Sequence, residues 1–176
     1  MSSLNKGVGK VEVSLKWDPS PAGVPDHDLD IIAAVYPADD PHGAPVYLVH
    51  FGSRSPDGTI TLSRDSRSGL GFGVDEAMTL ELNRLSPAYG RVVVGVAIQQ
   101  SSGRRTFGEI SNASVLVREG YTDLQSHDFA GLRDSTAATI VEFTRDGLGG
   151  WECRRAVRGF DADPQAFATV MGAPAA

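Results

Sequence analysis

The sequence predicts an all-β fold, a β-sandwich of two mainly antiparallel sheets with a few short helices. Two observations carry this prediction. About eight to ten short apolar or alternating runs are separated by clusters of Gly, Pro, Asp, Asn and Ser, which is the pattern of strands joined by turns. Only one stretch has persuasive helix signals, whereas an α/β chain would place a helix between successive strands.

The first strand is expected at residues 11–15, where Val11, Val13 and Leu15 alternate with polar residues. Alternation with a period of two predicts one buried and one exposed face. A proline-rich loop follows and cannot continue a strand ladder. Residues 29–36 are almost all apolar, which predicts a central strand buried on both faces. Further strands are expected at 46–51, 59–62, 78–82, 91–99, 113–118, 137–143 and 151–157.

The helix signal lies near the end of the chain. Asp163 is a suitable cap, Pro164 fits a first helical turn, and residues 165–171 follow before Gly172. A chain of 176 residues suits one domain, because it can bury roughly 70% of the surface that its unfolded form exposes. We expect a single domain over residues 1–176, with a core at about 4–160 and a helix and tail at 161–176.

Charge and composition narrow the function. The formal net charge is -6, which argues against nucleic-acid binding because a phosphate-backbone binder needs a basic stripe. Cys153 is the single cysteine and favours a reducing compartment. No stretch approaches the ~20 apolar residues of a membrane span, and the first residues lack the apolar core of a signal peptide. We therefore expect a cytoplasmic protein.

A glycine-rich acidic loop at residues 63–76 is the main candidate site. Its glycines alternate with other residues between an acid at one end and two at the other, so the backbone can turn tightly and direct carbonyls inward. Ca²⁺ takes six to eight oxygen ligands at about 2.3–2.6 Å. If a second acidic cluster at 26–30 meets this loop, five carboxylates converge: Asp28, Asp30, Asp65, Asp75 and Glu76. The alternative is a pair of solvated turns, since Asp and Gly are ordinary turn residues.

Several separated motifs occur together in a fixed order. They are Leu4-Asn5-Lys6-Gly7, Trp17-Asp18, Asp28-Leu29-Asp30, the stretch from Arg64 to Gly69 with Asp75-Glu76, Arg105-Thr106-Phe107-Gly108, Asn112-Ala113, Trp151-Glu152 and the run from Ala156 to Phe160. In order and spacing this set resembles the TerD family of tellurium-resistance and bacterial stress proteins, and the resemblance extends from Leu4 to about Phe160.

The resemblance implies a β-sandwich with calcium held in acidic loops. It also implies a role in tellurite resistance or the general stress response, without an established enzymatic reaction. The implied metal ligands are Asp28, Asp30, Asp65, Asp75 and Glu76, and Asp18 stands at the Trp-Asp position of the family. Carbonyls of Leu29, Gly71 or Gly73 are further candidates for the ligand set.

The acidic loop departs from the family pattern GDNxTGEGDGDDE. Leu70 stands where the family has Glu, and Phe72 and Val74 each stand where it has Asp. Because calcium affinity depends on the charge of the ligand set, the sequence predicts a degenerate, weak calcium site. Two alternatives stay open. One is a metal-free module that uses its acidic and apolar loops to bind proteins, such as other stress-response proteins. The other is a hydrolase that uses the acidic cluster.

Overall fold

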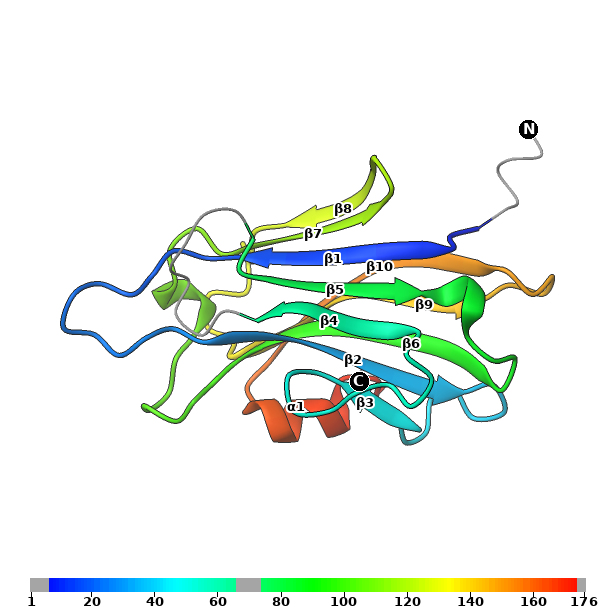
Figure 1. Cartoon of the computed structure of the whole chain (residues 1–176). Coiled ribbons are helices and arrows are strands. Elements are labelled where there is room, and N and C mark those ends of the chain that lie inside the picture. The colour runs from blue at the N-terminus through cyan, green and yellow to red at the C-terminus, as the bar shows by residue number, and fades with distance from the viewer. Residues whose placement is uncertain (1–6, 66–73, 174–176) are drawn as a thin grey trace.

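The computed structural model describes residues 7–65 and 74–173, without the side chains of residues 64 and 65. Two five-stranded antiparallel sheets stack face to face (Figure 1). The first sheet has the order β4-β5-β1-β7-β8 and the second has the order β10-β9-β6-β2-β3. The strands are β1 (Lys10–Lys16), β2 (Leu29–Pro37), β3 (Tyr47–Val49), β4 (Ile60–Asp65), β5 (Glu76–Glu81), β6 (Tyr89–Ile98), β7 (Ser114–Glu119), β8 (Thr122–His127), β9 (Ala137–Arg145) and β10 (Trp151–Phe160). The predicted β-sandwich is confirmed.

The inter-sheet core consists of the side chains that face inward from both sheets. In β1, Val11, Val13 and Leu15 are fully buried in this core, as their alternation predicts. The expectation that β2 is buried on both faces is also confirmed. Its odd-numbered residues, such as Ile31, join the inter-sheet core, whereas even-numbered residues such as Ile32 lie on the outer face of the second sheet.

The helix α1 (Pro164–Val170) covers that outer face (Figure 1). Its N-cap is Asp163, whose side chain accepts a hydrogen bond from the Ala166 amide at 2.8 Å, and Pro164 is its first residue, as predicted. Phe167 is fully buried on the sheet. It lies over Gly95 of β6, where an added Cβ would come within 2.6 Å of the Phe167 ring. The outer cluster so formed is Ile32, Ala34, Tyr36, Val93, Ala97, Ala137, Phe167, Ala168 and Met171.

Some element boundaries differ from the predictions. Residues 46–51 shorten to β3, because His50 and Ser53 close a tight turn through two backbone hydrogen bonds of 3.0 Å. Strand β4 runs on to Asp65 because its backbone pairs with β5 in a hairpin. The expectation that Leu82 belongs to a strand is wrong, since it begins a 3-10 helix, η2 (Leu82–Arg84). A second 3-10 helix, η3 (Phe107–Glu109), and the strand β8 were not predicted.

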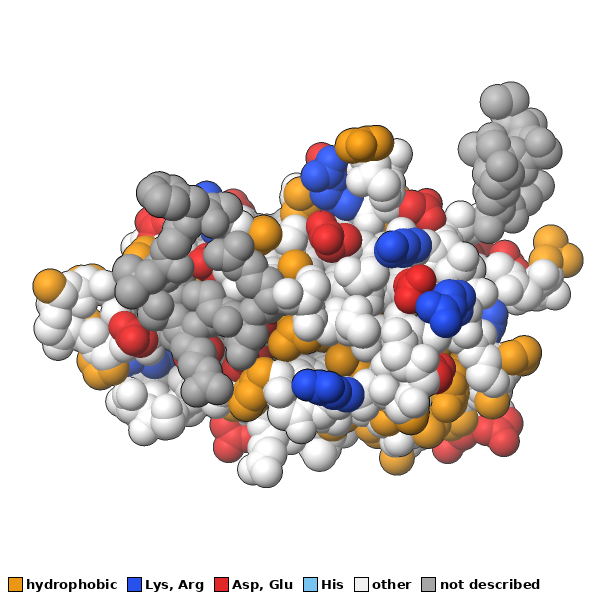
Figure 2. All heavy atoms as spheres, viewed as in Figure 1, with side chains coloured by type: hydrophobic (Ala, Val, Ile, Leu, Met, Phe, Trp, Pro, Cys, Tyr) orange, Lys and Arg blue, Asp and Glu red, His pale blue; other side chains and the backbone are white. Residues whose placement is uncertain are grey.

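Two edge strands, β8 and β10, end the sheets on one side. Strand β10 carries Arg154, Arg155 and Arg158, and its pairing with β9 shifts register between Arg155 and Arg158. The face seen in Figure 2 shows acidic and basic side chains interspersed rather than gathered into a patch of one sign. Among the described residues, no helix has the length and apolar character needed to cross a lipid bilayer.

Candidate functional site

The acidic end of the sandwich is where β4 ends at Asp65 and β5 begins at Glu76. The backbones of these two residues are paired in register, so the two ends of the predicted acidic loop lie side by side. Residues 66–73, including Gly69, Gly71 and Phe72, are outside the described residues, as is the side chain of Asp65. Among the described residues, Asp75, Glu76 and the strands around them form the acidic end.

Asp75 fastens the start of β5 to the end of β1. Its amide donates to the Leu15 carbonyl at 2.9 Å, and its Oδ2 accepts from the Trp17 amide at 2.9 Å. Asp75 is 2% exposed. A buried carboxylate is costly unless hydrogen-bonded, and a bond from a backbone N–H to a charged acceptor is stronger than one between neutral groups. Asp75 thus extends the β1–β5 pairing by one residue through its side chain.

Glu76 joins the two sheets. It is completely buried, and its Oε1 accepts from the Ile31 amide of β2 at 2.5 Å. The backbone of Asp28 faces β6, since its carbonyl accepts from the Gln99 amide. Backbone groups alternate sides along an antiparallel strand, so the amide of Ile31, three residues further on, points away from β6. Strand β3 pairs with β2 only from Ala33 to Val35, so it does not reach Ile31. The Glu76 carboxylate therefore accepts the hydrogen bond that a neighbouring strand would otherwise accept from Ile31, and it links the two sheets at this end.

Trp17 and Asp18 connect the acidic end to two neighbouring loops. The fully buried indole of Trp17 donates through Nε1 to the His27 carbonyl at 2.9 Å. The Asp18 carboxylate accepts from Asn112 Nδ2 at 2.7 Å, and its amide donates to the Ser111 carbonyl. These contacts give the Trp-Asp pair a structural role. Burial, with a smaller effect from the guanidinium of Arg105, holds the pKa of His27 below its ordinary value.

Asp30 lies on the opposite face of the second sheet from Glu76. It follows the even-numbered alternation of β2, and it lines the same pocket as Ile32. It is 2% exposed and accepts through Oδ2 from Gln99 Nε2 at 2.5 Å. The Asp28 carbonyl accepts from the Gln99 amide at 2.8 Å. The described side chains thus bring Asp75 and Glu76 to one end of β5 and leave Asp30 facing away from them.

The donor chemistry at the acidic end suits a hard cation. Carboxylate oxygens are the ligands that Ca²⁺ prefers, and a carboxylate offers about four lone-pair sites, so accepting an amide hydrogen bond does not by itself prevent a carboxylate from binding a cation. Within residues 7–65 and 74–173, however, no three His, Cys, Asp or Glu side chains are grouped so as to hold a metal ion. The described residues therefore bring two buried carboxylates together without forming a complete metal site.

A pocket of about 710 Å³ lies between α1, the start of β2 and the turn after β3. Its walls include Asp30, His50, Phe51 and Gln100. Sequence reasoning missed this pocket, although one signal was available. In a strand with a period of two, an acid at position 30 cannot share a face with the core residue Ile31.

The TerD domain model matches residues 1–170. The tellurium resistance protein TerD of an Alcaligenes species is 27% identical, over 91% of this chain and 85% of that protein. General stress protein 16U of Bacillus subtilis is 26% identical, over 98% of this chain and 92% of that protein.

A solved structure extends the comparison. The crystal structure of a homologue of telluride resistance protein (TerD) from Streptomyces coelicolor is 58% identical in sequence and superposes with a TM-score of 0.93. The match covers 96% of this chain and 100% of the Streptomyces chain. The two-sheet architecture and the placement of nearly every element are therefore those of a solved relative.

Proposed function

This chain belongs to the TerD domain family, and from that premise we propose that it is a non-enzymatic stress-response protein that binds Ca²⁺ weakly at the acidic end of its sandwich. Its relatives are named for tellurium resistance and for general stress, and we place this chain in the same role. The single cysteine, Cys153, supports a cytoplasmic location, where thiols stay reduced.

The pair of buried carboxylates at the start of β5 carries this proposal. Asp75 accepts from the amide of Trp17, the residue that follows β1, and Glu76 accepts from the amide of Ile31 in β2 of the opposite sheet. A cation bound by these two carboxylates would act on both segments and hold the acidic end together. Asp65 is the proposed third ligand, because its backbone is paired with Glu76. Ligation by Asp18, Asp28 and Asp30 stays a prediction.

Weak binding follows from the composition of the loop. Leu70, Phe72 and Val74 stand where the family pattern has acids. We expect a dissociation constant on the order of 10⁻⁵ to 10⁻³ M, the span from weaker sensor sites to extracellular modules. An ion that binds only the folded form stabilises it by roughly 2.7 kcal/mol at a hundredfold excess over that constant.

Calorimetric titration with CaCl₂ and thermal melts in calcium and in chelator test the proposal. Asp75→Asn removes one ligand charge with little change of shape, so the stabilisation by calcium should shrink. The matched control is Asp161→Asn, because Asp161 is exposed and lies on a different loop. The chelator arm measures the loss of the Trp17 hydrogen bond separately. If wild type shows no saturable heat and no calcium-dependent shift in melting temperature, the calcium proposal is wrong.

A metal-free interaction module is the second candidate. The observation that favours it is that Asp75 and Glu76 already have backbone donors, so the acidic end closes without an ion. In that case the acidic and apolar loops would bind other stress-response proteins. Its signature is a wild-type melting temperature that is the same in calcium and in chelator, together with a stability loss in Asp75→Asn that does not depend on calcium.

A further inference from the structure

We propose that His127 is a pH-sensitive switch: its neutral imidazole holds Phe129 against η3, and protonation of the imidazole releases Phe129. Strand β8 of the first sheet ends at His127, and residues 128–136, the crossover, lead to β9 of the second sheet. Phe129 is 3% exposed, whereas its neighbours Asp128 and Ala130 are exposed. Phe129 is therefore the residue that fixes the start of the crossover to the core.

Phe129 is held in an unfavourable backbone conformation. Its φ is +63°, in the left-handed region that a bulky side chain rarely adopts. Two contacts offset this cost. The Phe129 ring stacks on that of Phe107 in η3, with centroids 4.2 Å apart and an interplanar angle of 10°. The Phe129 amide donates a hydrogen bond to His127 Nδ1 at 2.9 Å. Loss of this hydrogen bond therefore favours a different conformation of Phe129.

The hydrogen bond from the Phe129 amide exists only while His127 is neutral. A neutral imidazole has one nitrogen that accepts and one that donates, whereas an imidazolium donates at both nitrogens. Protonation at Nδ1 therefore removes the acceptor and places two N–H groups against each other. An amide in so buried a residue is costly to leave without a partner. Release of Phe129 removes this cost and the backbone strain, and it uncovers the ring of Phe107, which is 4% exposed in the closed form.

The imidazole of His127 is half-buried and lies between this contact and a surface pocket. The pocket has a volume of about 430 Å³, and β7 contributes the uncharged Ser114 to its lining. Among the described lining residues, the charged ones are Arg155 from β10 and Asp128 from the crossover. Burial and the Arg155 guanidinium lower the pKa of His127, and the Asp128 carboxylate raises it by less. The imidazole is therefore neutral at pH 7, and the pocket gives protons a route to it in acid.

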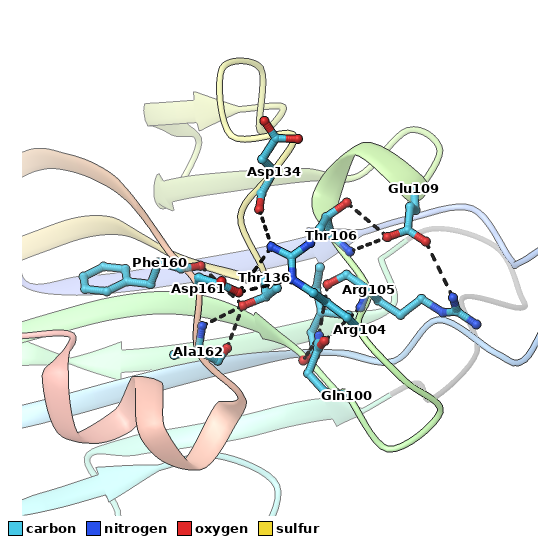
Figure 3. Close-up of polar contacts among 11 residues, drawn as sticks. Gln100, Arg104, Arg105, Thr106, Glu109, Asp134, Thr136, Phe160, Asp161 and Ala162 are labelled. Atoms are coloured by element: carbon cyan, nitrogen blue, oxygen red, sulfur yellow. Dashed lines mark hydrogen bonds and ion pairs between the residues drawn. The ribbon is translucent and has the colours of Figure 1, made fainter.

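The movement is confined to the start of the crossover, because its surroundings are fixed by other contacts. In η3, the Glu109 carboxylate accepts from the Thr106 amide and hydroxyl at 2.9 and 3.1 Å (Figure 3). At the end of the crossover, Thr136 Oγ1 bonds both the carbonyl and the amide of Ala162 at 2.8 Å (Figure 3). Backbone hydrogen bonds also hold residues 133 and 135 to η3. Protonation of His127 therefore frees residues 128–131 and leaves η3 and both sheets in place.

The test uses the full ¹⁵N-labelled chain in chelator, so its outcome does not depend on calcium. NMR between about pH 7.5 and about pH 5 follows the protonation of His127, the exchange protection of the Phe129 amide and the NOE contacts between the Phe107 and Phe129 rings. His127→Asn supplies an oxygen that can accept from the amide two residues on and does not titrate. His127→Ala removes the acceptor. The matched control is His42→Asn, because His42 is exposed in the loop between β2 and β3.

In wild type, the protection factor of the Phe129 amide should fall roughly five- to tenfold per pH unit below about pH 6, because the released form binds one more proton. The ring contacts should weaken in parallel. His127→Asn should keep both in acid, His127→Ala should lack both at neutral pH, and His42→Asn should behave as wild type does. The proposal is overturned if Phe129 stays protected and stacked once His127 is protonated, if His127→Asn shows the pH dependence of wild type, or if His127→Ala keeps Phe129 protected.

Discussion

Replacing Phe167 with alanine should release α1 from the second sheet. Phe167 is fully buried, its ring lies over Gly95, and its centroid is 5.2 Å from that of Phe160 at an interplanar angle of 66°. Changes of a buried Phe to Ala cost about 3–5 kcal/mol. Isolated helices shorter than ~12 residues are marginal in water, so the seven residues of α1 depend on this docking contact.

The magnitude can be converted to a thermal shift. In a domain of this size, 1 kcal/mol corresponds to about 2–4 °C in the melting temperature. A fully cooperative loss of about 3–5 kcal/mol therefore predicts a fall of roughly 6–20 °C. The matched control is Val170→Ala on the same helix, where the side chain is 40% exposed, and the expected change is within about 0.5 kcal/mol.

Two assays separate cooperative loss from local release. Melting followed by circular dichroism reports the whole sandwich, whose inter-sheet core does not include α1. Limited proteolysis reports exposure of the C-terminal segment alone. Local release of α1 would leave the melting temperature near that of wild type and make the segment after Phe160 sensitive to protease. If Phe167→Ala melts and is digested as wild type is, the docking argument is wrong.

Two further predictions concern buried titratable groups. Arg91 is 7% exposed, and its guanidinium donates to Glu142, Pro41 and Gly172 at 2.7–3.0 Å. Because an ammonium group cannot reproduce these donors, Arg91→Lys should lower the free energy of unfolding in urea by about 2–4 kcal/mol. A loss below about 0.5 kcal/mol would contradict this prediction. Burial also lowers the pKa of His27, His50 and His127 below 6.5. The unfolded chain then binds more protons just below pH 6.5, so the stabilisation by the neutral imidazoles is complete above that pH and is lost as pH falls through the folded pKa values. Urea unfolding at about pH 7.5 and about pH 5.5 should show lower stability at the acidic pH, with a smaller difference in His27→Gln, whereas equal stabilities would refute the assignment.

Much of the fold could be predicted because the signal is local. Residues 29–36 are apolar on both faces, since one face joins the inter-sheet core and the other lies under α1. The start of α1 is likewise predictable from adjacent residues, because Asp163 caps the helix and Pro164 follows it directly. Strand β8 was missed because Thr122–His127 is mostly exposed and carries little apolar pattern. Its pairing with β7, a contact between neighbours across a turn, makes it a strand.

The candidate site was less predictable because it depends on which side chains meet. The sequence identifies Asp75 and Glu76 as acids beside a glycine-rich loop. It does not show that Asp75 accepts from Trp17, after β1, and Glu76 from Ile31 in the opposite sheet. Alternation in β2 separates Asp30 from Ile31, whereas proximity in the sequence suggested a single acidic cluster. The pocket beside α1 depends on where that helix docks. That position is set by the contact of Phe167 with Gly95, two residues that are far apart in the sequence.

The arginines of β10 affect how the molecule behaves at high concentration. An edge strand exposes unpaired backbone groups that invite a strand of another molecule. The side chains of a strand added to β10 would be crowded against Arg154 and Arg155. The register shift before Arg158 also interrupts the regular pattern of backbone donors and acceptors with which an added strand would have to pair. Charge and irregularity at this edge both raise the barrier to intermolecular sheet growth. Replacing these arginines with valine should make the β10 edge prone to aggregation, measured as increased light scattering, and should leave the core unchanged.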